Sequence, residues 1–194
     1  MLGIFLDSEA NGLNPHRHRL LEIAFKIIDL NSAALMASYN TIIFQPETVW
    51  KESDLESLAI NGFTREKCIR GIPEAKVKEQ IIYLFREFSI ERKRAVFICQ
   101  NPSFDRIFFS QIIEPDLQEK LNWPYHWLDL ASMYWAIEIK KNQKLIEKSL
   151  SKDAIAKAYD LPPEAKPHSA LGGVNHLLLC YQAVVGFPEK PQNN

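Results

Sequence analysis

The sequence predicts an α/β protein in which a mixed sheet starts as an antiparallel meander, continues with parallel strands and is flanked by helices. Three stretches rich in branched and aromatic residues follow one another through short links, as in a meander. A helical period comes next, and then a near-continuous apolar run. Such a run is typical of a strand that is buried on both faces and paired in parallel.

The size and charge of the chain limit what it can be. With 194 residues, 46% of them hydrophobic, the chain can bury one real core. We therefore assign residues 1–187 to a single domain and residues 188–194 to a flexible C-terminal tail. The net charge of −1 predicts no long basic footprint on a nucleic acid, so such a partner would be held at a short site or an end.

The three cysteines are far apart, which argues against a disulfide framework or a zinc cluster and favours a reducing compartment. The first residues show no signal peptide, and no apolar run approaches the roughly 20 residues that cross a bilayer. We expect a cytoplasmic protein without a membrane partner.

Residues 4–10 are expected to form the first strand. Strand side chains alternate between two faces, so Asp7 and Glu9 should project together from the end of this strand. Two adjacent carboxylates repel each other, and a divalent cation between them removes this cost. A solvated strand end is the alternative interpretation, and further acids downstream would be needed to favour a metal site.

The next strands are expected at 20–29 and 36–44, and short helices at 45–71. Pro73 suits the first turn of the following helix. The apolar residues of that helix share one face at helical spacing: Val77, Ile81, Leu84, Phe85 and Phe88.

A buried strand at 95–99 leads directly into a helix, with Asn101 as its N-cap and Pro102 at its first position. Asp105 then lies in the first helical turn, at the end of a central strand, where open α/β sheets collect ligands. A first-turn Asp also favours a helix in its own right, so both interpretations stay open. Trp123 and Trp127, in the connection that follows, are expected to pack rather than to stack on bases.

A short strand at 128–130 and a helix at 131–139 follow, then a stretch with seven lysines between 140 and 166. These lysines are interpreted as a solvated face, with a backbone-guiding edge as the alternative. The last helix is expected at 168–186, with His168 at its start. Its core-facing residues should be those that repeat at intervals of three and four: Leu171, Val174, Leu178, Tyr181 and Val185.

Four segments together resemble the DEDDh 3′→5′ exonucleases, the superfamily of proofreading subunits, oligoribonuclease and RNase T. Residues 5–13, Phe-Leu-Asp-Ser-Glu-Ala-Asn-Gly-Leu, resemble the first family motif, and residues 101–109 resemble the second. Residues 128–133 resemble a strand-to-helix landmark, and residues 166–171, Lys-Pro-His-Ser-Ala-Leu, resemble the start of the third motif. The resemblance implies an RNase H-like fold with a mixed five-stranded sheet.

The sequence departs from the family pattern at one position. Five residues after the family's histidine stands an aspartate, the fourth acid of the metal site, whereas this chain has Gly173. Asn175 is about 200° away around a helix and is a poor substitute. The missing acid is expected to weaken the metal site on the side of the attacking water.

By resemblance, the protein is a 3′→5′ exonuclease that hydrolyses the 3′ end of single-stranded or short DNA or RNA with two Mg²⁺ or Mn²⁺ ions. Asp7, Glu9 and Asp105 would hold the metal ions, with Asp7 and Glu9 counted also as catalytic, and His168 would act as general base. The implied substrate-binding residues are Asn11, Leu13, Asn101 and Phe104. A core role is the alternative for Leu13 and Phe104. Several relatives are dimers, so a homodimer is possible.

The alternative function is a catalytically impaired protein of the same fold that binds nucleic-acid ends or a protein partner. Gly173 favours this alternative, whereas the presence of Asp7, Glu9, Asp105 and His168 favours the enzyme.

Overall fold

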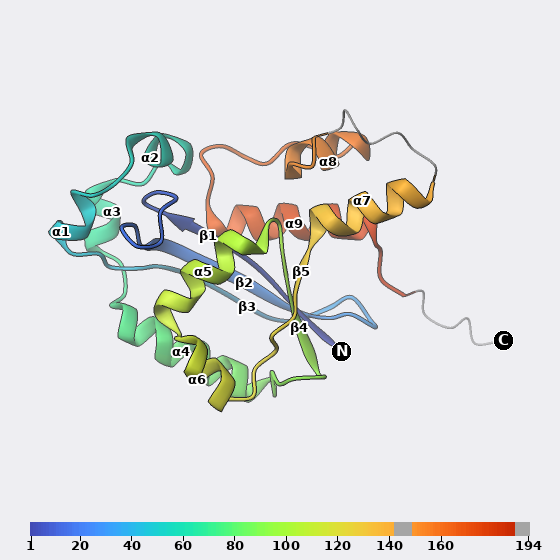
Figure 1. The fold of residues 1–194 in the computed structure, drawn as a ribbon, viewed down its shortest axis with the longest axis horizontal. Coiled ribbons are helices and arrows are strands. Elements are labelled where there is room, and N and C mark those ends of the chain that lie inside the picture. Colours follow the sequence, from blue (N-terminus) through green and yellow to red (C-terminus); the bar gives the residue numbers. More distant parts are fainter. Residues whose placement is uncertain (142–148, 189–194) are drawn as a thin grey trace.

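The computed structural model of the protein describes residues 1–141 and 149–188. Its centre is a five-stranded sheet of order β3-β2-β1-β4-β5, with helices against both faces (Figure 1). Two sequence predictions, the tail beyond residue 188 and the solvation of Lys144 and Lys148, fall outside the described residues. In the described part of the chain, no helix is both long and apolar enough to cross a membrane.

The first three strands form the expected antiparallel meander. Strand β1 (Leu2–Ala10) pairs with β2 (Leu20–Asp29), which pairs with β3 (Ala34–Ile42). The pairing places Glu9 opposite Glu22, so a third acid lies next to the predicted pair. The meander therefore concentrates negative charge at the C-terminal end of β1.

The last two strands are parallel to β1, as predicted. Strand β4 (Ala95–Cys99) pairs with β1, and β5 (Trp127–Asp129) pairs with β4. All residues of β4 are buried, which agrees with its unbroken apolar sequence. The C-terminal ends of β1 and β4 consequently lie at the same edge of the sheet, where the predicted acids are found.

Helices cover the two faces of the sheet and its end (Figure 1). Short helices follow β3: α1 (Glu47–Trp50), α2 (Leu55–Asn61) and α3 (Arg65–Ile69). One face carries α4 (Glu74–Glu87), α5 (Pro102–Ile112) and α6 (Pro115–Lys120). The other face carries α7 (Leu130–Lys140), α8 (Lys152–Ala158) and α9 (Ala170–Val184).

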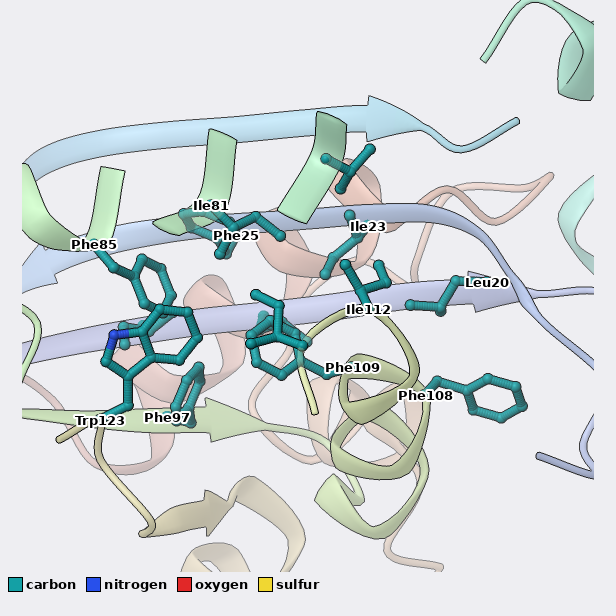
Figure 2. Packing of buried hydrophobic residues seen from close by; sticks show 14 of the residues in the cluster. Leu20, Ile23, Phe25, Ile81, Phe85, Phe97, Phe108, Phe109, Ile112 and Trp123 are labelled. Carbon is teal, nitrogen blue, oxygen red and sulfur yellow. The ribbon is translucent and has the colours of Figure 1, made fainter. Parts of the chain in front are cut away.

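Aromatic rings fill the core between the sheet and helices α4 and α5. Figure 2 shows Phe85 of α4 and Phe97 of β4 in this layer, together with Trp123. The ring centres of Phe85 and Trp123 are 4.7 Å apart, and Trp127 stacks on Phe97 at 4.0 Å. Both tryptophans therefore pack inside the protein, as the sequence predicted.

Helix α9 packs its small residues against the sheet, in addition to the predicted core stripe. Val174 and Tyr181 are buried and Leu171 and Leu178 pack against the core as expected, but Val185 is 42% exposed. Ala170, Gly173 and Cys180, outside the predicted stripe, are buried as well. Because small residues permit close approach, the helix is rotated so that they face β1 and β2, the strands with which α9 has most of its contacts.

Candidate active site

The side chains of Asp7 and Glu9 leave the end of β1 on the same side, as the strand alternation predicted. Both line one cavity of about 290 Å³, and His168 lines it too. Other residues contribute to the same cavity: Ser8, Gln100, Ser151, Lys152, Asp153 and Glu164. Asp7 and Glu9 thus share one cavity with His168, which is distant in sequence, and with further charged groups.

Asp105 joins the site from behind. It lies in the first turn of α5, is 3% exposed, and its Oδ1 accepts a hydrogen bond of 2.7 Å from the Ser8 hydroxyl. Ser8 points to the opposite face of β1 from its neighbours Asp7 and Glu9. Asp105 is thus not itself in the cavity lining, but it bonds the lining residue Ser8 and is close enough to Asp7 to feel its charge.

Burial raises the pKa of all three carboxyl groups. Desolvation, offset in part by the Lys152 ammonium, raises the pKa of Asp7 to about 7. Desolvation and the charge of Asp7 raise the pKa of Glu9 to about 8. The pKa of Asp105 is raised well above its usual value by desolvation and then by Asp7. Without a cation, this cluster favours bound protons near neutral pH.

Lys152 and Glu164 are site residues that the sequence analysis missed. The Lys152 ammonium lies 2.8 Å from Glu164 Oε2 and 3.5 Å from Asp7 Oδ1, and only 11% of its side chain is exposed. The solvated face that the sequence predicts for the lysines is wrong for Lys152. The inward orientation depends on where α8 docks, and the local sequence carries no signal for it.

The structure gives Gly173 a specific surrounding. A Cβ at this position would overlap Asp7 Oδ2, so the Asp7 carboxylate lies in the space that a side chain at 173 would need. The Gly173 carbonyl oxygen accepts a hydrogen bond of 3.4 Å from Lys152 Nζ. Where the family pattern has an acid, this protein therefore has the carboxylate of Asp7 and a lysine ammonium.

The donor chemistry of the site suits Mg²⁺ or Mn²⁺, but its arrangement matches the expected pair of ions only in part. Asp7, Glu9 and Asp105 offer the hard carboxylate oxygens that these ions prefer. Within residues 1–141 and 149–188, however, no three His, Cys, Asp or Glu side chains are arranged to hold a metal ion. Position 173 itself supplies no acid, and the acids beside it, Asp7 and Glu164, are paired with the Lys152 ammonium.

His168 is placed just before α9 by contacts on both sides. Its backbone N–H donates a hydrogen bond to the Ile60 carbonyl oxygen at 3.1 Å. Ala170, the first residue of α9, donates its backbone N–H to Glu22 Oε2 at 2.9 Å. Ser169 caps α9 by accepting from Gly172 N–H. The start of α9 is thereby fixed to both α2 and β2, which keeps the imidazole at the cavity wall.

The predicted substrate residues Asn11 and Leu13 both lie in the loop after β1, but one is buried and the other is exposed. Asn11 is fully buried: its amide donates to Val49 O and Ser53 Oγ, and its Oδ1 accepts from Arg19 N–H. These partners leave Asn11 a structural role, which corrects its expected contact with substrate. Leu13 is 74% exposed, so the alternative of an ordinary core residue is wrong for it.

The other two predicted substrate residues lie at the start of α5. Asn101 occupies the N-cap position in a left-handed conformation, without a side-chain cap; its Oδ1 accepts from Ser103 Oγ and its N–H donates to Asp129 Oδ1. Phe104 is partly buried against the core, 4.7 Å from the Phe108 ring. Its packing supports the core alternative, and neither residue lines the cavity.

Known nucleases resemble this chain in sequence. The chain is 29% identical over 118 residues to ribonuclease T of Shewanella frigidimarina, which covers 57% of this chain and 52% of that protein. It is 29% identical over 147 residues to oligoribonuclease of Chromobacterium violaceum, covering 71% of this chain and 78% of that protein. No family model matches the chain.

Among solved structures, E. coli exonuclease I in complex with a dT13 oligonucleotide superposes with a TM-score of 0.73 at 16% identity. The superposition covers 94% of this chain and 41% of exonuclease I, so this chain spans less than half of that protein. The likeness is one of fold: a mixed five-stranded sheet with helices on both faces.

The protein therefore has an exonuclease-like α/β fold. Its likeness to ribonuclease T and oligoribonuclease supports a place in the DnaQ-like 3′→5′ exonuclease superfamily.

Proposed function

We propose that this protein hydrolyses phosphodiester bonds at the free 3′ end of single-stranded or short DNA or RNA, in the cavity lined by Asp7, Glu9 and His168. The observation that carries the proposal is the meeting of these three residues at one cavity in a chain related to nucleases. The net charge of −1 fits a substrate held at one end rather than along its length.

Each of these residues has a role in the proposed reaction. Asp7, Glu9 and Asp105 would hold Mg²⁺ or Mn²⁺, which supplies an activated water and counter-charge for the leaving oxygen when bound. His168 accepts the proton of the attacking water from the cavity wall. Leu13, exposed on the loop after β1, is available to pack against a terminal base. We assign no role to a second ion beside Gly173.

A second function is favoured by the same half of the site. Lys152 forms ion pairs with Asp7 and Glu164 where the family pattern has an acid, which supports a protein that binds a nucleic-acid end without cleaving it. The two functions share the cavity and differ only in the fate of the scissile bond. Hydrolysis and binding must therefore be measured separately.

The test uses a 5′-labelled single-stranded oligonucleotide with Mg²⁺, with Mn²⁺ and with EDTA. The exonuclease produces a ladder that shortens from the 3′ end in the presence of metal, and Asp7→Asn abolishes it. His168→Ala is expected to lose about 10²–10⁴-fold in rate, the usual contribution of a general base, while the oligonucleotide still binds. Exposed Lys157→Gln serves as the control with an unchanged rate.

Three results separate the alternatives. Binding of the 3′ end without a ladder would establish the second function. Equal degradation in EDTA, or an undiminished ladder with Asp7→Asn, would contradict the proposed site. A 3′-phosphate that blocks neither binding nor cleavage would contradict recognition of a free 3′ end.

A further inference from the structure

The Lys152 ammonium in the cavity has three oxygen atoms as partners. Lys152 begins α8, directly after its N-cap Ser151, and its side chain runs inward. The ammonium lies 2.8 Å from Glu164 Oε2, 3.5 Å from Asp7 Oδ1 and 3.4 Å from the Gly173 carbonyl oxygen. Three oxygens from three different segments thus surround one cation.

The partners of Lys152 are themselves fixed and buried. The side chain of Glu164 is 6% exposed, and its backbone N–H donates to Asp153 Oδ1 at 3.0 Å, which ties the loop before α9 to α8. His176 Nδ1 lies 4.0 Å from Glu164 Oε2 on the other side. A buried ion pair leaves an uncompensated charge when one partner is removed. Removal of the Lys152 ammonium would therefore leave the Glu164 and Asp7 carboxylates without their compensating charge, and the reverse also holds.

Lys152 and Gly173 are in direct contact at the place where the family pattern has an acid. At position 173 the chain lacks the side chain whose Cβ would overlap the Asp7 carboxylate. The same residue offers its carbonyl oxygen to Lys152 instead. Where the family pattern has an acid, this chain therefore places the Lys152 ammonium, paired with the Glu164 carboxylate.

From this geometry we propose that the Lys152 ammonium is a built-in cation that takes the place of the second divalent ion beside Gly173. The inference deepens the proposed function, on which it rests for the identity of the cavity. It predicts a protein that takes one divalent ion where the two-ion pattern takes two. A unit charge about 4 Å from a bound cation changes divalent affinity by more than tenfold at an effective dielectric constant near 20.

Mn²⁺ binding to the metal-free protein, measured by isothermal titration calorimetry and by electron paramagnetic resonance, tests this proposal without any nuclease assay. Wild type is expected to bind a single Mn²⁺ in the cavity. Lys152→Gln is expected to bind Mn²⁺ at least tenfold more tightly or to gain a second site. Lys152→Arg, which keeps the charge, and Lys157→Gln, on the exposed side of the same helix, should behave as wild type.

Thermal unfolding keeps the test decisive if the variant is unstable. Lys152→Gln should melt below wild type in EDTA and regain its stability with Mn²⁺, because the ion replaces the lost ammonium. A variant that folds only with Mn²⁺ would support the proposal equally. A variant that binds Mn²⁺ with wild-type affinity and stoichiometry, or that stays unfolded with Mn²⁺, would overturn it. None of these results depends on whether the protein cleaves nucleic acid.

Discussion

The carboxylate of Asp7 lies against the Cα of Gly173, in the space where any side chain at position 173 would begin. The contact joins the first strand to the last helix, which are far apart in the chain. It also explains why a helix that would gain about 1 kcal/mol from alanine keeps a glycine at this position.

Gly173→Ala should have opposite effects with and without the Asp7 carboxylate. In the wild-type background the new Cβ overlaps Asp7 Oδ2, and overpacking of this kind typically costs about 1–3 kcal/mol. In Asp7→Ala the space is free, and the substitution should stabilise by up to about 1 kcal/mol. A double-mutant cycle by urea unfolding in EDTA measures the coupling. Equal effects in both backgrounds would show that the contact is absent.

Ser8→Ala should destabilise the protein by about 1–3 kcal/mol, since it leaves the buried Asp105 without the hydrogen bond of 2.7 Å that it accepts from Ser8. Ser110→Ala on the same helix as Asp105 removes only an exposed bond to the backbone and should change stability by less than about 0.5 kcal/mol. Chemical denaturation gives both values. A Ser8→Ala protein as stable as Ser110→Ala would refute the importance of this bond.

Metal-free stability should fall as the pH rises from about 4 to about 7. Burial raises the pKa of Asp7 to about 7 from 3.8, so the folded state holds a proton that the unfolded state releases in this range. Where the folded state binds more protons, stability decreases with pH. Asp7→Asn removes this group, so its stability relative to wild type should increase across the same range. A difference between the two proteins that is independent of pH would contradict the raised pKa.

Two neighbouring positions separate a structural role from a substrate contact. Asn11→Ala should destabilise by at least about 2 kcal/mol, because it removes three buried hydrogen bonds. Leu13→Ala, at a side chain that is 74% exposed, should leave stability within about 0.5 kcal/mol and raise the KM for an oligonucleotide instead. Unchanged KM with Leu13→Ala would remove Leu13 from the substrate site.

The parts of the site that could be predicted from sequence are those set by local periodicity. The two-residue alternation along β1 was sufficient to place Asp7 and Glu9 on one side, and the strand-to-helix junction placed Asp105 at the correct edge. Lys152 and Glu164 could not be found in this way. They meet because α8 and the loop before α9 dock over the end of β1, a tertiary arrangement to which neither local sequence contributes a recognisable pattern.

The substrate residues show the same limit. Asn11 stands in a motif that resembles a family signature, yet the loop closes on itself and takes up every polar atom of that side chain. The predicted core stripe of α9 is incomplete for a related reason. A periodicity of large apolar residues takes no account of small ones, although Ala170 and Gly173 allow the helix to approach the sheet and so help determine which side faces inward.

The most direct test of the central claim is the anomalous scattering of Mn²⁺ in a crystal of the protein with a short single-stranded oligonucleotide. We expect one Mn²⁺ peak among Asp7, Glu9 and Asp105, with Lys152 still paired to Glu164 and the 3′ end of the oligonucleotide in the same cavity. Two peaks with Lys152 displaced, or a 3′ end bound elsewhere on the protein, would contradict it.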